Sequence, residues 1–164
     1  MTLVSVVRPL VATDRTQWRS LWDAYCRFYK VEVPERVTGT LWSRIMDPSA
    51  PVKGLVATDA DGHLLGLCHY VLHPHTWSAQ LLCYLEDLFT VETARGQGVG
   101  SALINRLVEM GDKAGWGRVY WHTQETNTTA RILYDKLTGG HDGFVRYTVR
   151  PGTQTVNSGS SAVS

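Results

Sequence analysis

The sequence lacks a long apolar run and an excess of charge of either sign. No apolar stretch approaches the roughly 20 residues that a membrane-spanning helix needs. Sixteen Lys and Arg residues are balanced by fifteen Asp and Glu residues, so the basic excess typical of nucleic-acid binders is also missing. We therefore expect neither a membrane nor a nucleic acid as a partner.

The sequence has only three cysteines, and their spacing does not suggest a set of disulfides. Cys26, Cys68 and Cys83 are odd in number, widely spaced and form no CxxC motif, which predicts buried thiols in a reducing compartment. The first ten residues lack the basic and long apolar segments of a secretory signal, so we expect a cytoplasmic protein.

A metal site is not expected either. His69, His73 and His75 lie close to Cys68, but they would share one face of a strand only until Pro74 interrupts it. Neither an HExxH motif nor paired CxxC motifs support metal binding.

What the chain does have is the composition of one globular domain. It has 164 residues, of which 43% are hydrophobic, and its six Trp and seven Tyr can fill a substantial core. Residues 151–164 contain no charged and no aromatic side chain. We predict a domain over residues 1–150 and a flexible tail over 151–164.

Hydrophobic periodicity predicts alternating strands and helices. Strands are expected at residues 3–8, 52–58, 63–72, 81–91, 118–123 and 144–149, and helices at 15–28, 37–46, 99–114 and 128–136. The strands between residues 52 and 91 should form an antiparallel meander, whereas the strand-helix-strand unit at 81–123 should be parallel and right-handed. The predicted fold class is α/β, with a mixed, mostly antiparallel central sheet and flanking helices.

The strongest functional signal is the segment Arg95–Ser101, which reads RGQGVGS. Its three glycines allow backbone N–H groups to approach a ligand, and the helix that follows adds the positive end of its dipole. This pattern favours a phosphate-binding turn over a glycine-rich turn without a ligand. The P-loop pattern GxxxxGKS/T is absent, and the dinucleotide pattern GxGxxG lacks its third glycine.

The spacing Arg95-x-x-Gly98-x-Gly100 resembles the signature of the GCN5-related N-acetyltransferases. The resemblance extends to YLEDLF at residues 84–89 and to ETNTTARILY at residues 125–134, and in element order it covers roughly residues 3–150. Residues 84–134 look most like the branch of the spermidine/spermine acetyltransferases and the yeast histone and polyamine acetyltransferases. The resemblance implies an N-acetyltransferase that uses acetyl-CoA.

In this family the acetyl-CoA pyrophosphate would lie on the glycine-rich loop, and the pantetheine arm would pair with an exposed strand edge where two parallel strands splay apart. Backbone N–H groups of that strand would polarise the thioester carbonyl. The cofactor-binding residues that the resemblance implies are Leu88, Phe89, Thr90, Arg95, Gly96, Gln97, Gly98, Val99, Gly100, Ser101, Asn127 and Ala130. A plain helix N-cap is an alternative role for Asn127.

The reaction needs an uncharged amine, and a primary amine with a pKa of about 10.4 requires about 4.6 kcal/mol to be neutral at pH 7. A positioned base therefore matters. Glu86 and Asp87 stand in an apolar strand, where alternation would place them on opposite faces and partly bury the one that faces the cleft. The resemblance favours Glu86 as the base and implies Tyr134 as the general acid. Structural roles for the two acids, and plain packing for Tyr134, are the alternatives.

The acceptor is less defined by the sequence. We expect Tyr29, Glu32 and Glu86 to contact it, and a small primary amine such as an amino acid, a diamine or a polyamine-like molecule to be the substrate. Residues 73–80 contain no acid, which argues against a polyamine. A protein lysine or N-terminal amine, and a non-catalytic acetyl-CoA sensor, are the alternatives.

We expect direct attack in a ternary complex, with Cys83 a buried thiol rather than an acyl carrier. Because the family commonly pairs through its last strands, the resemblance also implies a homodimer.

Overall fold

A computed structural model describes residues 3–152 of the chain, which divide into two units. The unit of residues 1–127 contains a five-stranded sheet and three α-helices, and the second unit begins at Thr128. The elements of the first unit are β1 (Val6–Pro9), α1 (Arg15–Phe28), α2 (Glu35–Met46), β2 (Val52–Thr58), β3 (Leu64–His75), β4 (Ser78–Thr90), α3 (Val99–Ala114) and β5 (Val119–Tyr120), with 3-10 turns at Ala12–Asp14 and Glu92–Ala94. The second unit contains α4 (Thr128–Thr138).

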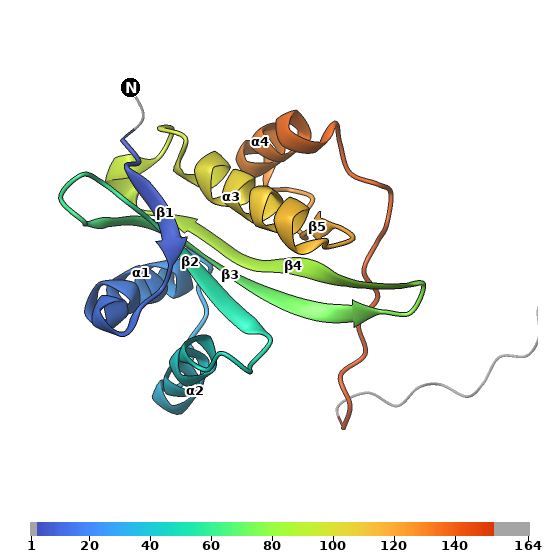
Figure 1. The fold of residues 1–164 in the computed structure, drawn as a ribbon, viewed down its shortest axis with the longest axis horizontal. Coiled ribbons are helices and arrows are strands. Elements are labelled where there is room, and N and C mark those ends of the chain that lie inside the picture. Colours follow the sequence, from blue (N-terminus) through green and yellow to red (C-terminus); the bar gives the residue numbers. More distant parts are fainter. Residues whose placement is uncertain (1–2, 153–164) are drawn as a thin grey trace, which may run out of the picture. The chain divides into compact units, whose positions relative to one another are not determined.

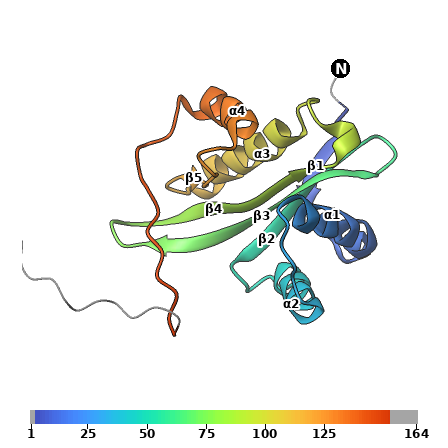
Figure 2. The same cartoon turned by 180° about the vertical axis from the view of Figure 1, so that it is seen from behind.

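The strands lie in the order β1-β2-β3-β4-β5. Neighbours from β1 to β4 are antiparallel, and β4 and β5 are parallel. Helices α1 and α2 lie on one face of the sheet and α3 lies on the other, as both views show (Figures 1 and 2). The predicted mixed α/β fold and its antiparallel meander are confirmed.

The core on the α1 and α2 face is built from the aromatic stripe of α1. Trp18 and Trp22 are buried, and Trp18 lies 4.8 Å from Trp42 of α2, measured between ring centroids. These rings pack against Leu67 and Phe89 of the sheet. Each such side chain contributes about 1.5–3 kcal/mol when it is fully buried, so this cluster anchors both helices.

Helix α3 approaches the opposite face of the sheet closely. Its stripe includes Val99, Leu103 and Leu107, none of which is more than 1% exposed. Gly66 of β3 permits this approach, because a Cβ there would lie 2.6 Å from Val99 Cγ1. The close contact fixes the start of α3, and hence the glycine-rich loop before it, relative to the sheet.

Two predicted strands differ from the structure. The strand expected at 118–123 is reduced to the two residues of β5. The strand expected at 144–149 is wrong: this segment has no regular secondary structure, and Phe144 and Tyr147 are 88% and 92% exposed. An alternating apolar pattern gives a strand only where a neighbouring edge accepts its hydrogen bonds. In the described part of the chain, no strand pairs with this segment.

The predicted tail lies outside the described residues from 153 onward, and its flexibility stays a prediction. Within residues 3–152, the helices are all too short or too polar to cross a membrane.

Candidate active site

Strands β4 and β5 separate after a short contact. They pair only at Cys83 with Val119 and at Tyr84 with Tyr120. On its other side, β4 continues to pair with β3 as far as Thr90. In the described residues the free edge of β4 is therefore unpaired beyond Tyr84, and Leu88, Phe89 and Thr90 lie along it. This is the open strand edge that the resemblance implied.

The glycine-rich loop connects this strand to α3. Gly96 and Gly98 have φ angles of 73° and 82°, in the left-handed region that glycine adopts without strain, and Gly98 is the N-cap of α3. A Cβ on either residue would meet no atom within 4 Å, so the space beside the loop is open. The first-turn N–H groups of α3 have no acceptor within the helix and can bind an anion there.

Arg95 and Gln97 hold the loop against its surroundings. The Arg95 Nε donates a hydrogen bond to the Thr90 carbonyl oxygen at 3.3 Å, and its guanidinium lies over the rings of Phe28 and Phe89 at 5.2 and 5.8 Å. The Gln97 side chain donates to the Thr93 carbonyl oxygen at 3.2 Å. The positive charge of Arg95 is thus fixed where the strand edge meets the loop.

Glu86 occupies a β-bulge in β4. His69 of β3 pairs with Asp87 and Tyr70 pairs with Leu85, so Glu86 has no residue opposite it. A bulge inserts one residue and interrupts the alternation of side chains. Glu86 is consequently exposed, and the partial burial that simple alternation predicted for the base is not observed.

Asp87, in contrast, belongs to a buried polar network. It accepts a hydrogen bond from the Tyr25 hydroxyl at 2.6 Å and pairs with Nδ1 of His69 at 2.9 Å. The Trp18 indole donates to His69 Nε2 at 2.9 Å. Because an indole N–H can only donate, His69 is neutral and its remaining proton lies on Nδ1, facing Asp87.

This network separates the roles of the two neighbouring acids. His69 is 1% exposed and joins α1 to the sheet through Trp18, so Asp87 has a structural role in which both its oxygens are engaged. Burial first, then the charge of Asp87 and more weakly that of Glu86, raise the pKa of Tyr25 above its usual range. Glu86 is exposed, so it is the acid that is accessible to a substrate.

Beside Glu86, β3, β4 and β5 form an aromatic wall that sequence reasoning missed. We use this name for His73, Tyr84, Tyr120 and His122. The Tyr120 hydroxyl is 2.7 Å from His73 Nε2, the Tyr84 hydroxyl is 3.1 Å from His122 Nδ1, and the two tyrosine rings are 5.2 Å apart. The run of three ring-bearing residues at 120–122, which reads YWH, was the signal that could have revealed it.

The other predicted site residues are more scattered. Tyr29 is 41% exposed and its ring lies 4.9 Å from that of Tyr25, so the two rings form one aromatic surface at the end of α1. Glu32 instead lines a hollow with residues of α1 and Thr38. Asn127 donates to the Thr123 hydroxyl at 3.3 Å. Ala130 and the half-buried Tyr134 lie on α4 in the second unit.

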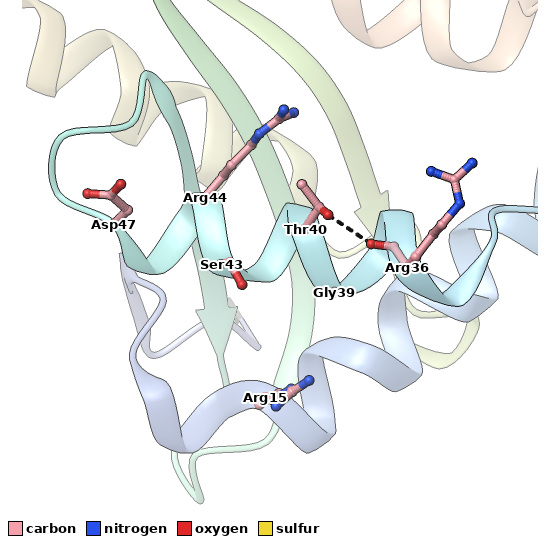
Figure 3. Close-up of a pocket in the computed structure, with 7 residues that line it drawn as sticks. All are labelled: Arg15, Arg36, Gly39, Thr40, Ser43, Arg44 and Asp47. Carbon is pink, nitrogen blue, oxygen red and sulfur yellow. Dashed lines mark hydrogen bonds between the residues drawn. The ribbon is translucent and has the colours of Figure 1, made fainter.

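A second hollow lies between the outer surfaces of α1 and α2 and contains no predicted site residue. Its lining consists of Arg15, Arg36, Gly39, Thr40, Ser43, Arg44 and Asp47. The guanidinium groups of Arg36 and Arg44 point away from Arg15 (Figure 3). The three cations therefore do not converge on one point, and this hollow is not the candidate site.

Comparison with known proteins decides the family. The model of the acetyltransferase (GNAT) family matches residues 18–139. The chain belongs to the GNAT acetyltransferase family. It is an N-acetyltransferase, and acetyl-CoA is its acetyl donor. The loop and the open strand edge described above are the parts of this GNAT chain that fit a pyrophosphate and an extended amide arm.

Among curated relatives, a D-amino-acid N-acetyltransferase of Saccharomyces cerevisiae is 35% identical over 133 residues, covering 80% of this chain and 83% of the relative. An aminoglycoside N(6')-acetyltransferase of Klebsiella aerogenes is 29% identical over 132 residues, covering 76% and 82%. A solved structure of a probable acetyltransferase has a TM-score of 0.81 at 21% identity, covering 92% of this GNAT chain and all of that one. The last likeness supports the fold.

Cys83 of this GNAT chain can be tested as an acyl carrier. It is fully buried, and burial raises the pKa of its thiol to about 12, so the thiol is protonated at pH 7 and is a poor nucleophile. We expect Cys83→Ala to keep wild-type turnover within about twofold, measured by thiol release from acetyl-CoA. Loss of activity in a variant with an unchanged melting temperature, together with an acetylated Cys83 in the wild type, would contradict direct transfer.

Proposed function

We propose that the chain transfers the acetyl group of acetyl-CoA to the primary amine of a small molecule by direct attack in a ternary complex. The observation that carries this proposal is the bulge, which presents the Glu86 carboxylate next to the open edge of β4. The names of the yeast and Klebsiella relatives, which act on an amino acid and an aminoglycoside, support a small-molecule acceptor.

Each part of the site has a distinct task in this proposal. The backbone of residues 96–101 binds the pyrophosphate, and the edge of Leu88–Thr90 pairs with the pantetheine arm. Acetyl-CoA supplies a thioester, whose carbonyl carbon is open to attack by a neutral amine. Glu86 removes the proton of the bound ammonium, directly or through water, and Tyr134 donates a proton to the leaving thiolate.

Thiol release from acetyl-CoA tests the function directly. The purified protein is incubated with amino acids of both hands, diamines, polyamines, an aminoglycoside and a lysine peptide. Release with small amines is the expected result, and release with the peptide alone would favour a protein acceptor. Acetyl-CoA binding without release for any amine would favour the sensor alternative.

The general-acid role predicts a specific phenotype for Tyr134→Phe. Only the hydroxyl is removed, so we expect kcat to fall about 10- to 100-fold while the dissociation constant of acetyl-CoA stays within about twofold. Tyr147→Phe, an exposed tyrosine of the same unit, is the matched control. If Tyr134→Phe retains full kcat, the proton comes from another donor.

The remaining parts of the proposal concern organisation. We propose a cytoplasmic homodimer with a flexible tail after residue 150. Light scattering tests the dimer, and limited proteolysis tests the tail, since cleavage after residue 150 should leave activity intact.

A further inference from the structure

Arg118 lies at the aromatic wall, and its guanidinium contacts a ring of the wall but no carboxylate of the described chain. It directly precedes β5, and its backbone carbonyl accepts a hydrogen bond from Cys83 N–H at 2.9 Å, which fixes its place beside β4. Its guanidinium lies 4.9 Å from the ring centre of Tyr120. Among the described residues, no carboxylate forms an ion pair with it.

The Arg118 side chain lies on the face of the sheet that carries α1. His69 faces α1, and His73 points to the same face because it is four residues further along β3. The Tyr120 hydroxyl is hydrogen-bonded to His73, so Tyr120 lies on the α1 side as well. Arg118 is two residues before Tyr120 and has the same orientation. Burial raises the pKa of Tyr120, the charge of Arg118 opposes this rise, and that of Glu86 adds to it. The charges of Arg118 and Glu86 thus both act on the Tyr120 phenol.

The backbone positions of Arg118 and Glu86 leave room for a short zwitterion between their side chains. Leu82 lies beside Arg118 in the parallel register, and Glu86 is four residues further along β4, which corresponds to about 13 Å of extended strand. Both side chains are long enough to extend toward each other over this distance. A bound molecule with an amine and a nearby carboxylate can then lie between their charged ends, over the Tyr120 ring.

We infer that Arg118 binds the carboxylate of the acceptor while Glu86 receives its amine, so that the acceptors of this enzyme are amino acids. A guanidinium can hold a carboxylate through two parallel hydrogen bonds, whereas it repels the second ammonium of a diamine. The Tyr120 ring lies between the two groups. His73 orients its hydroxyl: His73 Nδ1 donates to the Pro74 carbonyl oxygen at 2.9 Å, so His73 Nε2 accepts the hydrogen bond from the Tyr120 hydroxyl. This inference rests on the proposed function, because it assigns the acceptor of that same site.

The test compares amino acids with the amines obtained by removing their carboxylate. Lysine is paired with 1,5-diaminopentane, and phenylalanine, in both hands, with phenethylamine; kcat/KM is measured from thiol release. For the wild type we expect kcat/KM for the amino acid to exceed that for its amine by roughly 10- to 100-fold, with the better enantiomer of phenylalanine taken for the comparison. In Arg118→Gln this preference should disappear through a higher KM for the amino acid. The kcat/KM for 1,5-diaminopentane should rise because the repulsion is removed, whereas the kcat/KM for phenethylamine and the acetyl-CoA affinity should stay unchanged.

Arg36→Gln is the matched control, because it removes an exposed arginine from the hollow between α1 and α2 (Figure 3). The inference is overturned if Arg118→Gln keeps the wild-type preference, or if Arg36→Gln loses it. Failure of the proposed function gives a different result, since no amine of either kind would then release thiol from the wild type. If amines are acetylated and the preference does not depend on Arg118, the proposed function holds and only the carboxylate site at Arg118 is rejected.

Discussion

A Gly98→Glu variant is expected to lose acetyl-CoA binding by at least 100-fold. Gly98 is the N-cap of α3 and has a φ of 82°, with open space where a Cβ would be. A glutamate there places a negative charge at the N–H groups that receive the pyrophosphate, so its repulsion adds to the loss of space. Isothermal titration with acetyl-CoA measures the change.

Backbone strain must be separated from charge in this experiment, since the left-handed conformation is unfavourable for glutamate. Gly98→Asn is the appropriate comparison, because asparagine tolerates this conformation and carries no charge. We expect it to bind acetyl-CoA more tightly than the glutamate variant. Gly39→Glu, on the surface of α2, controls for an added acid. A folded Gly98→Glu protein with wild-type affinity would remove the loop from the cofactor site.

The second large effect is expected for Glu86→Gln. The amide keeps the shape of the side chain but cannot accept a proton at neutral pH, so we expect kcat to fall by about 10²- to 10⁴-fold. Binding of acetyl-CoA should not change, because Glu86 is expected to contact the acceptor. Turnover at high pH, where more of the amine is already neutral, should recover part of the loss. The measurement is kcat against pH for both proteins.

Asp87→Asn provides the contrast that distinguishes the two acids. Asp87 accepts hydrogen bonds from Tyr25 and His69, so its replacement should lower the free energy of unfolding by about 1–3 kcal/mol. Glu86→Gln should leave that free energy within about 0.5 kcal/mol, as is usual for an exposed residue. Equal stability losses in both variants would assign Glu86 a structural role, and an unchanged kcat in Glu86→Gln would exclude it as the base.

Much of the fold follows from local patterns in the chain. The expected range 52–58 coincides with β2, and the helix expected at 99–114 coincides with α3, because Gly98 and Gly115 mark its two ends with left-handed conformations. The glycine-rich loop was predicted for the same reason: its chemistry is contained within a few consecutive residues. Such features need no knowledge of distant contacts.

The features that local patterns missed depend on residues far apart in the sequence. The bulge at Glu86 arises from the register between β3 and β4, and alternation within one strand cannot reveal it. The bond between Trp18 and His69 joins residues 51 positions apart. Residues 144–149 have a strand-like composition, but an edge to pair with is a property of the whole sheet. A role for Arg118 can be inferred only from its contact with the Tyr120 ring, which the sequence alone does not show.

The bulge also bears on how such an enzyme can change its substrate. Strands β3 and β4 pair on both sides of position 86 and pass over it, so the backbone ladder does not require a particular side chain there. Asp87, one residue later, is tied to α1 and β3 at once. Adjacent positions therefore differ in their tolerance to substitution: one can be exchanged to suit a new acceptor, while its neighbour keeps the scaffold in place. An inserted residue gives this sheet a point at which chemistry can diverge while folding is conserved.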